Sequence, residues 1–201
     1  MVNIFIARHG QDVDNRNGIL NGHRDLPLTE KGIAEAHQVA DLISAAKLHF
    51  DAVYTSPLLR ASETAAIITT VQGGPMPIKE DLLIERDFGI MTGKKVADIS
   101  MLCASDILIT DMATYFLEPF GAETFPDLLK RSRLLLDKLE KLHPSGNILL
   151  VAHGDIGKML YAEYYHLHWE EVLMQFHFGN CDLLLLSADS PASASHVFQI
   201  R

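Results

Sequence analysis

The sequence has few cysteines, a deficit of basic residues and no long apolar run. Only Cys103 and Cys181 occur among its 201 residues, in neither a metal-ligand nor a CxxC spacing. We interpret both as reduced core residues. The 17 lysines and arginines are outnumbered by 26 acidic residues, and the net charge is −9. This balance argues against a nucleic-acid-binding protein, because such proteins present a basic face.

No segment approaches the roughly 18 apolar residues of a membrane span. The N-terminus lacks the basic stretch and apolar run of a signal peptide. We therefore expect a cytoplasmic protein that contacts no membrane. The length favours one domain, residues 1–201, and 48% hydrophobic residues suffice for a sizeable core.

Buried strands alternate with helices along the chain. Short apolar runs predict strands at 2–7, 51–56, 147–154, 181–188 and 195–200. Helical spacing predicts a helix capped by Thr29, one capped by Ser56 with Pro57 in its first turn, one over 121–142 and one from about 155. The expected buried faces of the first and third helices carry Ile33, Ala36, Ala40 and Ile43, and Phe125, Leu128, Ser132, Leu135, Leu139 and Leu142. The alternation predicts an α/β fold, a three-layer sandwich with a mostly parallel central sheet and helices on both faces.

The stretch at about 86–120 does not fit that alternation. We predict that it is an insertion of short helices over one edge of the sheet, a lid on the single domain. It contains "MLCASDILI" and "MATYFLEPF", and its apolar residues are expected to form the lid's own core.

Two predicted strands, "IFIARHG" and "LLVAHG", end in His-Gly. Ligands of open α/β sheets bind beyond the carboxyl ends of the strands, so His9 and His153 should stand at the same edge. Either histidine alone would more often be structural. Arg8 and Arg60, the latter in the first turn after the second strand, should face the same edge, and either glycine would permit a close approach or an unusual turn.

Two imidazoles and two guanidinium groups at one point favour phosphoryl transfer. Guanidinium forks match phosphate oxygens, and a neutral imidazole is a competent nucleophile near pH 7. The residues therefore indicate a phosphohistidine intermediate, with arginines neutralising the phosphate in place of a metal. No histidine pair has the i, i+4 spacing with a carboxylate that metalloenzymes use, so we predict no metal site.

The chain resembles the histidine phosphatase superfamily, also called phosphoglycerate mutase-like. The resemblance is carried by "ARHGQDVDN", "GHRDLPLTEKG", "SPLLRASETA", "LIERDFG" and "VAHG", which follow the family's order from residue 7 to residue 154. It implies that His9 accepts the phosphate, with His153 as the second pocket histidine. It also implies phosphate contacts for Arg8, Arg60 and Asn15, substrate contacts for Asn21, Gly22 and Gly154, and a proton-donor role for Glu85. Without the resemblance, Glu85 beside Arg86 would be interpreted as a surface ion pair.

Two acids depart from the family's pattern. Asp12 stands where the family usually has Ser or Thr, and because a carboxylate there would repel a phosphate, we expect it to turn away from the pocket. Asp155 follows the second His-Gly and has a plain structural explanation, since an acid is favoured in the first turn of a helix.

The lid departs further, because it lacks cations. Between Lys95 and Lys130 there is no Lys, Arg or His, whereas six acids occur: Asp98, Asp106, Asp111, Glu118, Glu123 and Asp127. The resemblance implies that mutases and sugar-bisphosphate phosphatases need cations there for a carboxylate or second phosphate. We therefore expect a preference for singly phosphorylated substrates, with hydrolysis dominating over mutase activity. Lys94 and Lys95 could swing inward and oppose this expectation.

The leading hypothesis is a cofactor-free phosphatase acting on a small phosphorylated metabolite. The alternatives are a phosphoglycerate mutase, and a module without turnover that binds a phospho-ligand or another protein. The retained His9, His153 and Glu85 argue against the last. A homodimer is compatible with the sequence, which does not identify the natural substrate.

Overall fold

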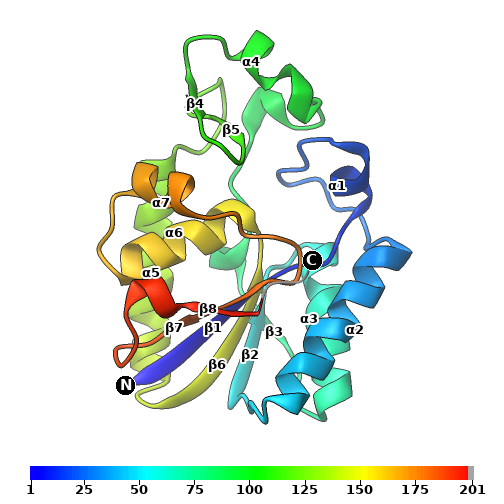
Figure 1. Ribbon diagram of the computed structural model, residues 1–201, viewed down its shortest axis with the longest axis vertical. Helices are drawn as coiled ribbons and strands as arrows, with labels where there is room; N and C mark the ends of the chain where they lie inside the picture. The colour runs from blue at the N-terminus through cyan, green and yellow to red at the C-terminus, as the bar shows by residue number, and fades with distance from the viewer. Residues whose placement is uncertain (199–201) are drawn as a thin grey trace.

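The computed structural model describes residues 1–198, which form a sheet covered on both faces (Figure 1). The six strands lie in the order β3-β2-β6-β1-β7-β8. Their bounds are Val2–Arg8 (β1), Ala52–Thr55 (β2), Ile78–Lys79 (β3), Gly146–Ala152 (β6), Leu183–Leu186 (β7) and His196–Phe198 (β8). The four strands from β3 to β1 are parallel, whereas β7 and β8 are antiparallel to their neighbours. The predicted sandwich is confirmed, and residues 199–200 of the last predicted strand lie outside the described residues.

The two faces of the sheet carry separate cores. Alternate residues of β1 point to opposite sides: Ile4 and Ile6 join one core, and Phe5 and Ala7 join the other. Both faces of the sheet are therefore buried, which explains why the strand sequences are continuous apolar runs. The first core is covered by α5 (Phe125–Leu142), α6 (Gly154–Tyr164) and α7 (Trp169–Gln175), and the second by α2 (Glu30–Ala45) and α3 (Leu59–Gln72).

Two of the long helices begin at a capping threonine. Thr29 caps α2 by accepting from the Gly32 amide, and Thr124 caps α5 by accepting from the Asp127 amide. The predicted Ser56 cap is wrong, because α3 begins at Leu59 without a side-chain cap. Ser56 accepts instead from the Leu58 amide and bonds to His153. A tertiary contact thus overrides the local signal.

Two residues predicted for buried helix faces are exposed. Ile33 in the first turn of α2 is 43% exposed, and Leu142 at the end of α5 is 55% exposed. Both lie in terminal turns, where the helix has passed the edge of the core that it covers.

The segment 86–120 lies outside the main sheet, above its carboxyl edge (Figure 1). It contains two 3₁₀ turns, Gly89–Met91 and Val96–Asp98, the short helix α4 (Ile99–Leu102), and an antiparallel pair, β4 (Ile107–Ile109) with β5 (Thr114–Phe116). The hairpin was not predicted. A small core of its own, which includes Phe88, Met91, Ile99 and Phe116, holds the segment together, as expected. We keep the name lid for this segment.

Three shorter helical pieces complete the fold, one of them a 3₁₀ turn at Ala192–Ala194 before β8. Helix α1 (Val13–Asn17) follows β1, and a 3₁₀ turn at Asp81–Leu83 follows β3. No helix within residues 1–198 combines the length and apolarity that a membrane crossing requires.

Candidate active site

The two predicted histidines meet at the carboxyl ends of neighbouring strands. Strands β1 and β6 pair in parallel with Arg8 opposite Ala152, so His9 and His153 follow at the same level. The His9 amide donates to the Ala152 carbonyl at 3.0 Å. Both side chains are buried, and their ring centroids are 5.0 Å apart. The strand register therefore brings the two imidazoles into one site.

Arg60 of α3 lies between the two imidazoles. Its Nε is 3.3 Å from His9 Nε2 and 3.2 Å from His153 Nδ1. Its terminal nitrogens donate to the carbonyls of Arg24 at 2.7 Å and Gly22 at 2.9 Å. Each of these two nitrogens has a second hydrogen, so the guanidinium is fixed in place and can still donate to a ligand.

The hydrogen bonds assign the tautomers of both rings. His9 Nδ1 lies 2.7 Å from the Gly10 carbonyl, which only accepts, so Nδ1 carries the proton and Nε2 has a lone pair. His153 Nδ1 accepts from Arg60, so its proton is on Nε2, which donates to Ser56 Oγ at 2.7 Å. Burial, followed by the positive charges of Arg60 and Arg8, holds the pKa of His9 well below its usual value. Burial and Arg60 lower the pKa of His153 in the same way. Both imidazoles are neutral at pH 7.

Arg8 is a second donor at this edge. Its terminal nitrogen donates to the Phe178 carbonyl at 2.6 Å, whereas its buried Nε has no partner within the described residues. An unpaired buried donor in a polar pocket indicates a ligand position. Asn15 lines the same pocket, and its Oδ1 accepts from Asn180 Nδ2 at 3.2 Å. Asn180 also donates to the His9 carbonyl at 2.8 Å, and the sequence analysis missed it.

Asp12 does not turn away as expected. It is fully buried, caps α1 by accepting from the Asn15 amide, and lies 3.3 Å from Arg60 Nε. The oxygen that faces Arg60, Oδ2, also accepts from Asn21 Nδ2 at 2.8 Å. The Arg60 guanidinium therefore balances the negative charge of Asp12, which stays beside the two histidines. Asn21 lines the pocket, and Gly22, at φ +48°, contributes the carbonyl that holds Arg60.

Glu85 lies at the N-terminus of α6. Its carboxylate accepts from the amides of Arg86 at 2.9 Å, Ile156 at 3.1 Å and Asp155 at 3.3 Å. Burial raises the pKa of Glu85, and the Asp155 carboxylate raises it further, against the opposing effect of the amides. A carboxyl group with a raised pKa can hold a proton for a leaving group.

The surface ion pair suggested by "ER" is not formed. Arg86 is 1% exposed and pairs with Asp155 Oδ2 at 2.8 Å rather than with Glu85. Its guanidinium lies over three aromatic rings, those of Phe88, Phe116 and Phe125, with distances of 4.3 to 5.1 Å. Asp155 is indeed in the first turn of α6, and it also ties the lid to that helix through Arg86.

Arg131 of α5 fixes the loop that carries Glu85. It donates to the carbonyls of Leu82 at 2.8 Å, Ile84 at 2.7 Å and Glu85 at 3.3 Å, and it pairs with Glu123 at 2.7 Å. No pattern around Arg131 indicates this role, since an arginine on a helix usually faces solvent.

The glycines after the two histidines differ. A Cβ on Gly10 would lie 2.3 Å from the Gly32 carbonyl oxygen, so close backbone approach requires glycine there. A Cβ on Gly154 would meet Glu85 Oε2 at 3.8 Å and Arg8 Nε at 3.9 Å, which are ordinary contacts. The backbone does not require glycine at position 154, although a side chain there would contact both Glu85 and Arg8.

Beside these residues lies a cavity of about 200 Å³, which His9, His153 and Arg60 themselves do not line. It is lined by Arg8, Asn15, Asn21, Glu85, Gly154 and Asp155 and, from the lid and α6, by Tyr115 and Lys158. None of the six acids at 98–127 lines it, and neither do Lys94 and Lys95. The premise that acids of the lid would repel an anion is therefore wrong. Lys158, which the sequence analysis missed, supplies a cation from α6 instead.

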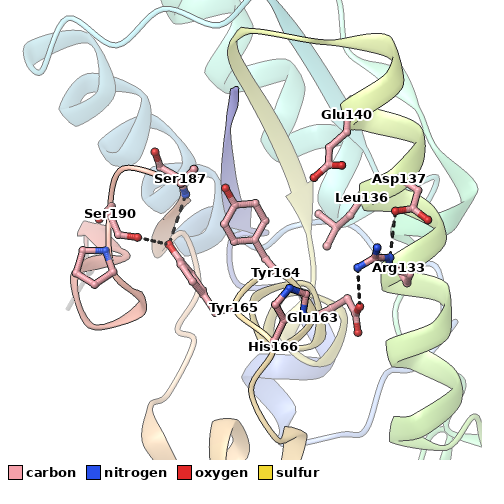
Figure 2. A pocket seen from close by; sticks show the side chains of 12 residues that line it. Arg133, Leu136, Asp137, Glu140, Glu163, Tyr164, Tyr165, His166, Ser187 and Ser190 are labelled. Atoms are coloured by element: carbon pink, nitrogen blue, oxygen red, sulfur yellow. Dashed lines mark hydrogen bonds and ion pairs between the residues drawn. The ribbon is translucent and has the colours of Figure 1, made fainter.

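A larger cavity of about 530 Å³ lies between α5, the end of α6 and the loop after β7 (Figure 2). Its arginine, Arg133, is paired with Asp137 at 3.1 Å and Glu163 at 3.3 Å. Neither predicted histidine is near it, and the size of this cavity does not make it the candidate site. In the part of the chain that the structure describes, no three His, Cys, Asp or Glu side chains are arranged to hold a metal ion.

Comparisons with known proteins agree with this arrangement. The sequence matches the family described as Histidine phosphatase superfamily (branch 1) over residues 4–199. A 2,3-bisphosphoglycerate-dependent phosphoglycerate mutase of Methylobacterium sp. is 33% identical over 156 residues, 76% of this chain and 75% of the mutase. A protein of the same name from Parvibaculum lavamentivorans is 31% identical over 174 residues, 85% and 83% of the two chains. A solved mycobacterial glucosyl-3-phosphoglycerate phosphatase, in complex with VO3, superposes with a TM-score of 0.79 at 25% identity, covering 92% of this chain and 90% of that one.

Proposed function

The chain belongs to the histidine phosphatase superfamily, and we propose that within it the protein hydrolyses a small phosphomonoester through a phosphohistidine on His9. The observation that carries this proposal is the tautomer of His9. Its Nδ1 proton is held by the Gly10 carbonyl, so the Nε2 lone pair faces Arg60 and the second imidazole. A neutral, oriented imidazole beside fixed guanidinium groups suits attack on a phosphoryl group.

The reaction has two steps in this proposal. His9 Nε2 attacks phosphorus, the N–P bond forms as the bond to the leaving oxygen breaks, and Glu85 gives its proton to that oxygen. Water then attacks phosphorus, Glu85 takes a proton from the water, and the N–P bond breaks to release phosphate. Glu85 is thus returned to its protonated form.

Electrostatic stabilisation comes from the chain's own donors. The unpaired Nε of Arg8 and the second hydrogens of the Arg60 terminal nitrogens are available to the oxygens of the transferring group. Such fixed donors supply most of what phosphoryl transfer requires. We therefore propose that neither a metal nor an organic cofactor takes part, and that Asn15, Asn21, Gly22 and Gly154 border the substrate.

The test is hydrolysis of p-nitrophenyl phosphate by the wild type and by His9→Ala. The matched control is His37→Ala, which changes an exposed histidine. We expect turnover by the wild type and the control and none by His9→Ala, whose circular dichroism should stay native. Labelled phosphate trapped during turnover should be acid-labile, base-stable and map to His9. Label on a serine, an aspartate or His153 would contradict the proposal, and absence of any turnover would favour the non-catalytic module.

Phosphoglycerate mutase activity is the second candidate, because the two relatives described above carry that name. A mutase must retain a bisphosphate while it reorients, so its phosphoenzyme must resist water. An assay of 3-phosphoglycerate isomerisation beside hydrolysis of phosphomonoesters distinguishes the two. We expect hydrolysis to be faster, and isomerisation at or above the best hydrolysis rate would decide for the mutase.

A further inference from the structure

Lys158 is a buried cation that the proposed mechanism does not use. It lies on the second turn of α6 and is 3% exposed. No carboxylate within residues 1–198 forms an ion pair with it, and its one described hydrogen bond is to Tyr115 Oη at 2.6 Å. Lysine is almost never buried without a charged partner, because desolvation of the ammonium group is costly. An unpaired lysine at the wall of the active-site cavity therefore indicates a place for an anion.

Tyr115 of the lid adds a second donor beside the Lys158 ammonium group. It lies on β5 of the lid, lines the same cavity, and has its ring 5.1 Å from the Lys158 ammonium. Burial raises the pKa of Tyr115 well above its usual value, so the hydroxyl keeps its hydrogen. The hydroxyl accepts from Lys158 and can donate to a ligand, and the ammonium group has two further hydrogens. Ammonium and phenol together offer up to three donors.

The charges around the pair limit the anion to a small, singly charged one. Burial lowers the pKa of Lys158 to about 8, so the side chain is mostly protonated at pH 7. Asp155 and Glu85 line the same cavity, which is only about 200 Å³. A second phosphate would bring up to two negative charges to one ammonium group beside these acids. A carboxylate matches the single positive charge.

We infer that Lys158 and Tyr115 form a carboxylate-binding subsite that selects phosphomonoesters of small hydroxy acids. The inference rests on the proposed phosphatase function. In it, the cation that binds the leaving group is Lys158 of α6 and not a residue of the lid. It reverses the expectation from the sequence that an anion would be excluded there.

The test compares substrates that differ only at the carboxylate. 3-Phosphoglycerate and glycerol 3-phosphate share the phosphate and the three-carbon chain, as phosphoserine and phosphoethanolamine share the phosphate and the amine. We expect the wild type to prefer the carboxylate member of each pair by about tenfold to a hundredfold in kcat/KM, as expected for hydrogen bonds to a charged group. No preference in either pair would overturn the inference.

Two substitutions assign the preference to the pair. In Lys158→Gln the ratio of kcat/KM values should fall to about one, and in Tyr115→Phe it should fall several-fold. Lys130→Gln, which changes a lysine that is 76% exposed on α5, should keep the wild-type ratio. Equal losses on both members of a pair would leave the ratio unchanged and show that Lys158 supports the fold or the chemistry rather than carboxylate recognition.

A binding measurement separates failure of this inference from failure of the proposed function. Calorimetry with His9→Ala should show tighter binding of 3-phosphoglycerate than of glycerol 3-phosphate, and His9→Ala/Lys158→Gln should lose the difference. Hydrolysis of p-nitrophenyl phosphate without a carboxylate preference would reject the subsite alone. A binding preference without any hydrolysis would support the subsite and reject the phosphatase.

Discussion

Arg60 balances a buried carboxylate and, in the proposed reaction, donates to the phosphoryl group, so Arg60→Ala should remove both effects. In the folded chain its Nε lies 3.3 Å from Asp12 Oδ2, and both side chains have no exposed surface. Arg60→Ala leaves a buried carboxylate without its counter-charge, which costs about 3–5 kcal/mol of unfolding free energy. It also removes a fixed donor from the phosphoryl site, which should lower kcat by about 10²–10³-fold.

A second substitution distinguishes the two effects. In Asp12→Asn/Arg60→Ala neither position of this ion pair carries a charge, so the double variant should recover a large part of the lost stability, with a coupling energy of about 1–3 kcal/mol. Its activity should remain at the level of Arg60→Ala, because no donor has been restored. Arg133→Ala is the matched control: Arg133 pairs with Asp137 at 3.1 Å but is 54% exposed, so the loss should stay below about 1 kcal/mol.

Urea unfolding gives the stabilities, and hydrolysis of p-nitrophenyl phosphate gives the rates. Additive stability changes in the double variant would show that Asp12 is not the charge that Arg60 balances. Activity that returns together with stability would show that Arg60 acts through the fold alone.

Three further predictions concern the proton donor and cofactors. Glu85→Gln should slow hydrolysis of alkyl phosphates by about 10²–10⁴-fold and that of p-nitrophenyl phosphate much less, because nitrophenolate leaves without a proton; equal losses would exclude Glu85 as the acid. Asp155 raises the pKa of Glu85, and Glu85 is active when protonated. Asp155→Asn should therefore lower that pKa and move the alkaline limb of the kcat/KM profile for an alkyl phosphate to lower pH, whereas Asp137→Asn should leave the limb in place. Incubation with EDTA followed by desalting should leave activity unchanged, and a loss reversed by a divalent ion would show that a metal takes part.

The meeting of the two histidines could be predicted because it depends on few facts. Continuous apolar runs occur where a strand is buried on both faces, and parallel strands place their carboxyl ends at one edge. His9 and His153 each follow such a run directly. Neither the strand order nor the register was needed to predict a shared edge, and the structure supplies both by pairing β1 with β6.

Contacts between distant segments could not be predicted in the same way. Nothing in "SPLLRASET" indicates that Ser56 bonds to His153, so the local pattern suggested a helix cap. Nothing around Asp12 indicates that Arg60 will lie beside it. Such positions break local rules because a functional site uses the side chain elsewhere.

Lys158 is different, because a signal for it was present. It stands between Gly157 and Met159 in a helix whose residues from Ile156 to Ala162 are all buried. A single lysine in a helix segment that is apolar on every side has no solvent face, and that pattern could have identified it. None of the lid residues that line the cavity is a cation, whereas α6 contributes Lys158 to the same cavity.

The neutral state of the two imidazoles determines which hydrogen bonds His153 can form in the free site. Arginine only donates, so the contacts of Arg60 Nε with His9 Nε2 and His153 Nδ1 require a lone pair on both nitrogens. In the free site His153 is therefore an acceptor and not the donor to phosphate that a protonated ring would be. To donate, it must gain a proton at Nδ1 while Arg60 turns its hydrogen elsewhere. The negative charge of a bound phosphoryl group favours both changes, since it raises the proton affinity of the ring and offers Arg60 a stronger acceptor. We therefore expect substrate binding to promote protonation of His153, with Arg60 linking the two events.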